Sequence, residues 1–244
     1  MAGIIELNDV TFSVDNRPIV KNITLEFEEG KTTALVGPSG SGKSTVLKLS
    51  AGILVPSQGE VCFRGKDVFS MSHQENLDFR REAAMIFQDS ALWANQSLQQ
   101  NLELPLRIHF PKMPERERNA RIREVLEEVG YKRDLSIRPS QLSMGEQKLI
   151  AFARAMMCRP KLLYLDEWTE SLDRPASHRL VGLVQRHQKE HNTVILVCHD
   201  FRIVKDLADY IIMLIGGEFS MKLSRDQLEQ DEDLSRYIER GIAS

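Results

Sequence analysis

The chain of 244 residues is 42% apolar and carries a formal net charge of −3, a balance that suits an ordinary globular protein with a sizeable core. Its basic residues are dispersed, so we expect neither nucleic acid nor an anionic lipid surface as a main partner. The three cysteines lie far apart and form no C-x-x-C pair, which disfavours a disulfide framework or a zinc site and favours a reducing compartment.

The amino-terminal part of the chain predicts strands joined by tight turns. Residues 4–14 and 19–27 alternate apolar and polar side chains, and the turn-forming residues 15–18 lie between them, so this segment predicts a β-hairpin. A third apolar run, at residues 32–36, is typical of a buried strand. A helical pattern follows and continues to Leu54.

Between that strand and that helix lies a glycine-rich loop of the form G-x-x-x-x-G-K-S. Its glycines let the backbone turn sharply and present bare N–H groups to phosphate oxygens, and the helix that follows adds its positive dipole. Lys43 is placed to reach the β- and γ-phosphates of a nucleoside triphosphate, and the Ser44 hydroxyl to bind Mg²⁺. A loop that only caps a helix would not require Lys-Ser after Gly42. The predicted nucleotide-binding residues are Gly37, Pro38, Ser39, Gly40, Ser41, Gly42, Lys43, Ser44 and Thr45.

Helices dominate the middle of the chain. Residues 83–87 are typical of a buried strand, and the pattern then becomes helical from about 89 to 160. Two helices are clearest there: one opens at Pro114 and stops at Gly130, and the other begins at Ser143.

After Pro160 strands and helices alternate again. Strands are predicted at 162–165, 193–197 and 210–215, and helices at 175–190, at 201–208 and at the carboxyl end. This alternation predicts an α/β fold: a P-loop NTPase core with a mainly parallel sheet, an antiparallel β edge and an inserted α-helical lobe. We expect a single domain over 1–244, with the nucleotide-binding core at 1–88 and 161–244 and the helical lobe at 89–160.

Two acidic residues follow the predicted strand at 162–165. The carboxyl ends of parallel strands are where ligands bind in α/β sheets, so Asp166 is placed to hold Mg²⁺. Glu167 could accept a proton from an attacking water or orient that water. Acids at a strand end are often only helix caps, but a phosphate-binding loop in the same chain favours the catalytic interpretation.

The sequence around residue 143 has a good purely structural interpretation. Ser143 and Glu146 have the spacing of a capping box in front of a helix with an apolar stripe. A helix start capped in this way can also bind an anion.

The run Leu142-Ser143-Met144-Gly145-Glu146 resembles the L-S-G-G-Q signature of the ABC (ATP-binding cassette) ATPases, the superfamily that pairs this signature with both Walker motifs. Three more family motifs have counterparts, in order and at family spacing. Gln88 resembles the Q-loop glutamine, Ser171-Leu172-Asp173 the D-loop, and Val197-Cys198-His199-Asp200 the switch-histidine motif. A single histidine after an apolar strand would otherwise be read as a core or capping residue.

The resemblance implies a mechanism that no single motif shows. Two copies of the chain would face each other head to tail, and each ATP would lie between one phosphate-binding loop and the other copy's signature. The implied catalytic residues are Lys43, Glu167 and His199; Mg²⁺ would be held by Ser44, Gln88 and Asp166; the signature contacts in trans would come from Ser143, Gly145 and Glu146, and the D-loop acid is Asp173. The implied partners are ATP, a second copy and integral-membrane permease subunits. We therefore expect a cytoplasmic protein held peripherally on the inner membrane through its permease.

Several positions depart from the family pattern. Met144 replaces the first signature glycine and Glu146 replaces its glutamine, while Trp168 stands where proline is usual. Glu170 replaces a small residue. An aromatic side chain that stacks on adenine is usual where this chain has Val14, which we still expect to lie against the base.

Three functions are compatible with the phosphate-binding loop: the motor of a membrane transporter, an ABC ATPase that does not transport, and a kinase that shares only this loop. The signature and the switch histidine argue against the kinase. Ribosome-acting members usually carry two cassettes in one chain and DNA-repair members carry long insertions, and neither is present here. A regulatory subunit of a membrane complex, as in cell-division systems, stays open.

Within transporters, residues 87–93 and 101–107 resemble the Mla/Mce-type phospholipid-transport ATPases, which show F-Q-x-x-A-L-F and N-V-x-x-P-L-R in these places. The carboxyl-terminal residues 233–238 resemble the tail of the same proteins. Methionine importers and lipoprotein-release motors share part of this pattern. The sequence thus favours lipid transport and leaves amino-acid import and lipoprotein release as alternatives.

Overall fold

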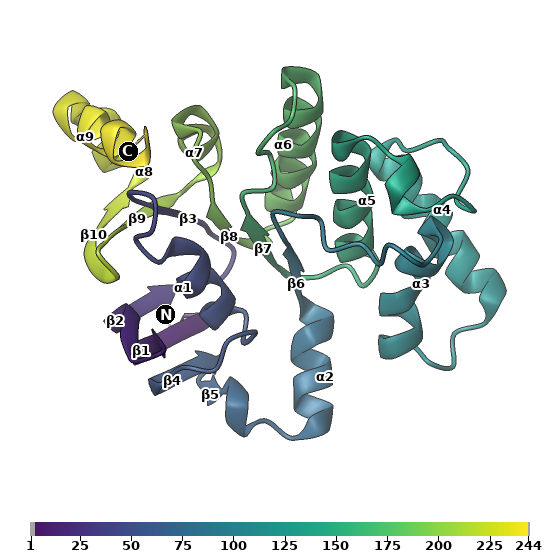
Figure 1. Cartoon of the computed structure of the whole chain (residues 1–244), viewed down its shortest axis with the longest axis horizontal. Helices are drawn as coiled ribbons and strands as arrows, with labels where there is room; N and C mark the ends of the chain where they lie inside the picture. The colour runs from purple at the N-terminus through teal and green to yellow at the C-terminus, as the bar shows by residue number, and fades with distance from the viewer. Residues whose placement is uncertain (1–2, 244) are drawn as a thin grey trace.

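The computed structural model describes residues 3–243, and its centre is a six-stranded sheet (Figure 1). Its strand order is β10-β9-β3-β8-β7-β6, in which β10 alone pairs antiparallel with its neighbour. The strands are β3 Thr32–Val36, β6 Ala83–Ile86, β7 Leu162–Asp166, β8 Thr193–Val197, β9 Tyr210–Ile215 and β10 Glu218–Ser224. Every residue of β3, β7 and β8 is buried, as expected of parallel strands covered on both faces. The predicted mainly parallel α/β sheet is confirmed.

A smaller antiparallel sheet with the order β2-β1-β4-β5 supplies the predicted β edge. Its strands are β1 Ile5–Val14, β2 Arg17–Phe27, β4 Gln58–Phe63 and β5 Lys66–Asp67. Helix α1, Lys43–Ser50, lies between the two sheets (Figure 1). It buries Val46, Leu47 and Leu49 in a core shared with residues of both sheets, so the start of this helix is held rigidly against the strand ends.

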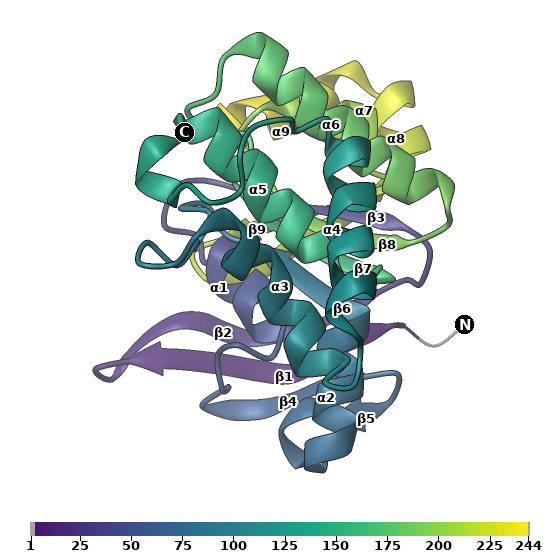
Figure 2. The same cartoon turned by 90° about the vertical axis from the view of Figure 1, so that its right-hand side faces the viewer.

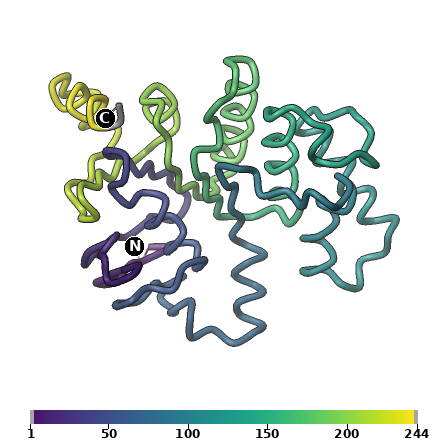
Figure 3. The backbone as a smooth tube through the Cα atoms, viewed as in Figure 1, coloured from purple at the N-terminus to yellow at the C-terminus, as the bar shows by residue number. Residues whose placement is uncertain are grey.

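Helices α3 to α9 cover the other face of the large sheet and one end of it. Helices α3 Leu98–His109, α4 Glu115–Val129 and α5 Met144–Met156 lie together beside β6 (Figures 1 and 2). Helices α6 Arg174–Lys189, α7 Phe201–Leu207, α8 Arg225–Gln230 and α9 Glu232–Ala243 lie on the side of the sheet opposite α1. One continuous apolar core joins α3–α5 to this face of the sheet. The chain leaves the sheet after β6 and returns at β7 (Figure 3).

Four features differ from what the sequence predicts. Helix α1 ends at Ser50, so Leu54 lies in the loop beyond it. Helix α2, His73–Glu82, was not predicted, because Phe79 is the one fully buried residue among its ten and no apolar stripe marks it. The short strand β5 and the mostly exposed edge strand β10 were not predicted either. Short 3-10 turns at Val68–Ser70 and Pro139–Gln141 complete the chain.

Within residues 3–243, no helix combines the length and the apolar character that crossing a membrane requires. Cys62, Cys158 and Cys198 are free thiols, of which Cys62 and Cys198 are buried.

Candidate nucleotide-binding and hydrolysis site

The loop of residues 37–42 connects β3 to α1 and has the backbone shape of a phosphate cradle. Gly37 has a φ of 142°, and a Cβ atom there would lie 2.1 Å from the carbonyl oxygen of Leu214. Gly42, directly before α1, has a φ of 91°. These positions require glycine, since a side chain would clash or be strained. The predicted loop therefore sits at the carboxyl end of β3 and at the start of a helix, where backbone N–H groups and the helix dipole favour an anion.

Lys43 is almost entirely buried at the first position of α1. Its Nζ donates hydrogen bonds to the carbonyl oxygens of Gly37 and Pro38, each at 2.8 Å. Burial lowers the pKa of Lys43, while the charges of Glu167 and Asp166 act in the opposite direction. The ammonium group is thus held inside the loop by backbone oxygens, the kind of contact that phosphate oxygens can replace.

Ser44 and Asp166 meet although 122 residues separate them in the sequence. The Ser44 hydroxyl donates to Asp166 Oδ1 at 2.7 Å, and Lys48 Nζ lies 3.4 Å from Asp166 Oδ2. Asp166 is buried at the end of β7, next to the end of β8. A hydroxyl and a carboxylate oxygen side by side fit the oxygen ligands of Mg²⁺, which usually keeps waters and phosphate oxygens as its other ligands. Among the described residues, no group of three or more His, Cys, Asp or Glu side chains is arranged to hold a metal ion.

Glu167 lies beside His199, which the sequence assigned to catalysis, and beside Gln88, which it assigned to the metal. His199 Nε2 is 2.8 Å from Glu167 Oε1, and Gln88 Nε2 donates to Glu167 Oε2 at 3.0 Å. Gln88 Nε2 also donates to Glu170 Oε2. Glu167 has a φ of 47°, so the chain turns sharply here and directs its carboxylate toward the ends of β6 and β8. The structure therefore brings Gln88, Glu167 and His199 together; the assignment of Gln88 to the metal stays a prediction.

Of two further residues next to this cluster, the sequence reasoning missed Lys148 and noted Trp168 only as a departure from the family pattern. Lys148 on α5 is buried, and its Nζ donates to the carbonyl oxygens of Glu167 at 3.2 Å and Glu170 at 2.8 Å. Burial lowers the pKa of Lys148. Trp168 is fully buried in the large core. The sequence offered one signal for this contact between α5 and the turn after β7: Lys148 is a lysine next to the apolar stripe of its helix.

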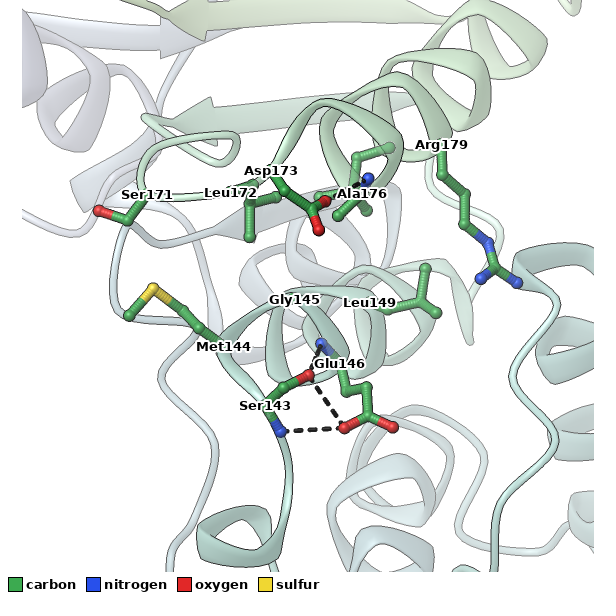
Figure 4. Close-up of a pocket in the computed structure, with 11 residues that line it drawn as sticks. Ser143, Met144, Gly145, Glu146, Leu149, Ser171, Leu172, Asp173, Ala176 and Arg179 are labelled. Atoms are coloured by element: carbon green, nitrogen blue, oxygen red, sulfur yellow. Dashed lines mark hydrogen bonds between the residues drawn. The ribbon is translucent and has the colours of Figure 1, made fainter.

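The signature residues lie away from the phosphate-binding loop in the single chain. Helix α5, which Ser143 caps, packs on α3, α4 and β6, whereas α1 packs on strands of both sheets. The signature instead lies beside the D-loop, across a cavity of about 380 Å³ (Figure 4). Asp173 caps α6 there by accepting a hydrogen bond from the backbone N–H of Ala176 at 2.9 Å. Met144, at the first position of α5, is 55% exposed.

Val14 lies at the end of the amino-terminal hairpin, opposite Arg17, and the residue is 49% exposed. The strand does not alternate regularly up to this point, because the pairing with β2 shifts between Val10 and Phe12 and again after Phe12. Position 14 is therefore accessible, but its place against an adenine base stays a prediction.

A family model described as "ABC transporter" matches residues 20–170, more than half of the chain. The chain belongs to the ABC transporter family. It is an ATPase, and it couples the hydrolysis of ATP to transport.

Relatives of this ABC ATPase cover nearly all of the chain. The intermembrane phospholipid transport system ATP-binding protein MlaF of Haemophilus influenzae is 35% identical over 95% of this chain and 88% of its own length. The nickel import ATP-binding protein NikE of Shigella flexneri is 32% identical over 93% of this chain and 86% of its own length. The ATP-binding cassette MJ0796, solved as a dimer with ADP and phosphate after hydrolysis, has a TM-score of 0.83 and 28% identity, covering 91% of this chain and 98% of that one.

Proposed function

We propose that this ABC ATPase drives phospholipid transport, with two copies of the chain closing around ATP on the cytoplasmic face of a membrane permease. The observation that carries the cargo assignment is the match to MlaF along nearly the whole chain, which agrees with the motif in residues 87–107. Relatives with nickel or sulfate in their names show that the family alone does not decide the cargo.

The segment after β6 supports docking of a permease. Asn101 fixes this segment, because its Oδ1 accepts from the Trp93 backbone N–H at 2.8 Å and its Nδ2 donates to the Trp93 carbonyl at 3.2 Å. Arg154 donates to the carbonyls of Ala91 and Ser90 at 2.7 and 3.1 Å. Trp93 is nevertheless 53% exposed. A large apolar side chain presented on a firmly held loop suits contact with a membrane partner.

Within one copy, the residues around the loop 37–45 divide the work of hydrolysis. The loop amides and Lys43 would bind the phosphates, and Ser44 with Asp166 would hold Mg²⁺, whose charge offsets that of the phosphates. Glu167 would accept a proton from the attacking water, and His199 would fix the orientation of Glu167 through their 2.8 Å contact. Residues 1–88 and 161–244 would carry out this chemistry, and residues 89–160 would form the helical lobe on which the permease docks.

The signature would act on the ATP of the other copy. Ser143 and Gly145 lie at the exposed start of α5, away from their own loop, so they are free to meet a nucleotide across an interface. The dimeric structure of MJ0796 supports this arrangement. Asp173, beside the signature in Figure 4, would lie at the same interface. Closure then depends on ATP, and loss of the γ-phosphate on hydrolysis lets the copies separate.

Purification of the chain from native membranes tests the cargo. We expect it to co-purify with an integral-membrane permease, and the complex in vesicles to move labelled phospholipid only with ATP. Glu167→Gln in the same complex provides the control for ATP-driven movement. A permease that carries nickel, an amino acid or a lipoprotein, and leaves phospholipid in place, would contradict the lipid assignment.

The isolated chain should be mostly monomeric and a weak ATPase, and the permease should stimulate it. The reason is that each site needs a second copy, while Met144 and Glu146 alter the surface that the other copy would meet. Sedimentation and phosphate release, measured with and without the membrane subunits, check this expectation. Full turnover by a dilute monomer would contradict a site shared between two copies.

Val14→Tyr should tighten ATP binding severalfold and leave its Mg²⁺ dependence unchanged. Stacking of a base on an aromatic ring contributes roughly 1–3 kcal/mol in nucleic-acid complexes, and valine has no π-face. Titration with ATP and GTP should also show only a modest preference for ATP in the parent chain. Equal ATP affinity in the variant and the parent would mean that position 14 does not lie against the base, or that another aromatic side chain already covers it.

A further inference from the structure

Glu146 gives the start of α5 a negative charge where the family signature has a neutral glutamine. The Glu146 carboxylate closes a capping box: its Oε2 accepts from the Ser143 backbone N–H at 2.9 Å and from the Ser143 hydroxyl at 3.0 Å (Figure 4). The Ser143 hydroxyl in turn accepts from the Glu146 backbone N–H at 3.3 Å. Ser143, the residue proposed to contact the γ-phosphate, is therefore hydrogen-bonded to a carboxylate.

Arg133 holds the other side of that carboxylate. Its Nη1 donates to Glu146 Oε1 at 2.8 Å and to Oε2 at 3.0 Å. Arg133 lies in the loop between α4 and α5, thirteen residues before its partner, and the pair stays accessible, with the Arg133 side chain 51% and the Glu146 side chain 29% exposed. The hydrogen bonds from Arg133 and Ser143 hold the pKa of Glu146 below its ordinary value, so the carboxylate is ionised at neutral pH.

The charges at this helix start decide whether an anion can approach it. The N-terminus of a helix carries roughly +0.5 elementary charge, which favours a phosphate, but a full negative charge on Glu146 outweighs it. Two like charges brought together across an interface weaken association. The positive charge of the Arg133 guanidinium offsets the negative charge of the Glu146 carboxylate, and the helix dipole then leaves the start of α5 net positive.

We propose that Arg133 is a positioning residue of the shared ATP site, which neutralises Glu146 so that the γ-phosphate of ATP on a second copy can reach Ser143 and Gly145. This inference rests on the proposed sandwich dimer and adds to it a residue outside the signature. It accounts for how the chain keeps a working signature with glutamate in place of glutamine.

The test is a double-mutant cycle in the full chain carrying Glu167→Gln, which should stay dimeric with ATP bound. This Glu167→Gln chain is the parent in the comparisons that follow. Sedimentation gives the ATP concentration for half-maximal dimerisation. Arg133→Ala should raise that concentration about tenfold, as expected for an unpaired charge facing an anion. Glu146→Gln should require no more ATP than the parent, because glutamine also completes a capping box. Arg133→Ala combined with Glu146→Gln should return to within about twofold of Glu146→Gln alone, since no charge is then left to neutralise.

Arg159→Ala is the matched control. Arg159, in the turn after α5, forms an exposed ion pair with Glu124 of α4, so its removal makes the same change of charge away from the signature. It should leave dimerisation unchanged, and thermal unfolding of every variant should stay near the parent, because exposed ion pairs contribute little to stability.

Two results would overturn the inference while leaving the sandwich dimer in place. In the first, Arg133→Ala dimerises at the same ATP concentration as the parent. In the second, Arg133→Ala combined with Glu146→Gln needs as much ATP to dimerise as Arg133→Ala alone. The second of these would mean that Arg133 only supports the shape of its loop. A parent that remains monomeric with saturating ATP would instead refute the sandwich dimer, and this inference with it.

Discussion

Replacing Glu167 with glutamine should reduce ATP turnover by at least about 100-fold, the lower range for removing a general base. ATP binding should be retained, because Glu167 follows Asp166 at the end of β7 and contacts Gln88 and His199 rather than the loop that would hold the phosphates. The unhydrolysed nucleotide should then hold two copies together. Steady-state phosphate release and nucleotide binding, measured on the same preparation, check both parts.

Glu170→Gln provides a matched control for that experiment. Both carboxylates accept a hydrogen bond from Gln88, but the 2.8 Å contact with His199 belongs to Glu167. The control should therefore lose less than about tenfold in turnover, well under the effect of removing a general base. Turnover of Glu167→Gln within a few-fold of the parent, or an equal loss in both variants, would contradict the assignment of Glu167 as the base.

Lys43→Met should fail at an earlier step, with ATP binding weakened by about 100-fold, because removal of one member of a buried charge pair costs roughly 2–5 kcal/mol. In the parent chain the Lys43 ammonium contacts the carbonyls of Gly37 and Pro38. Methionine keeps the apolar stem of lysine and removes this ammonium. Calorimetric titration of ATP measures the loss, and thermal unfolding without nucleotide separates it from misfolding. Tight ATP binding by a folded variant would show that Lys43 does not contact the phosphates.

The parallel core could be predicted because its strands are buried on both faces. β7 and β8 appear in the sequence as continuous apolar runs, and a parallel sheet places their carboxyl ends at one edge. That reasoning anticipated the meeting of Asp166 with the loop of residues 37–45 across 122 residues. Helix α2 could not be found in the same way, because Phe79 is its one buried residue and no apolar stripe marks it; the capping box of Ser72 and Glu75 was the sequence signal for its start.

The contacts around the candidate site were harder to predict from the sequence. Trp168 and Glu170 were noted as departures from the family pattern, but their neighbours come from other elements. Lys148 is buried because the turn after β7 lies over α5, and this contact depends on how the helical lobe packs against the sheet. The partner of Glu146 was likewise not evident, since Arg133 belongs to an irregular loop that no periodic pattern describes.

Sharing of each ATP between two copies can be measured by sedimentation of the Glu167→Gln chain with and without Gly145→Asp. A Cβ at Gly145 would meet only Ala176 Cβ at 3.5 Å and Leu172 Cδ2 at 3.8 Å, so the fold should accept the change. An acid in the first turn also suits a helix, yet it would repel a phosphate. We expect the Glu167→Gln chain to dimerise with ATP, and the double variant to bind ATP and remain monomeric. Equal dimerisation of both chains would contradict the shared site.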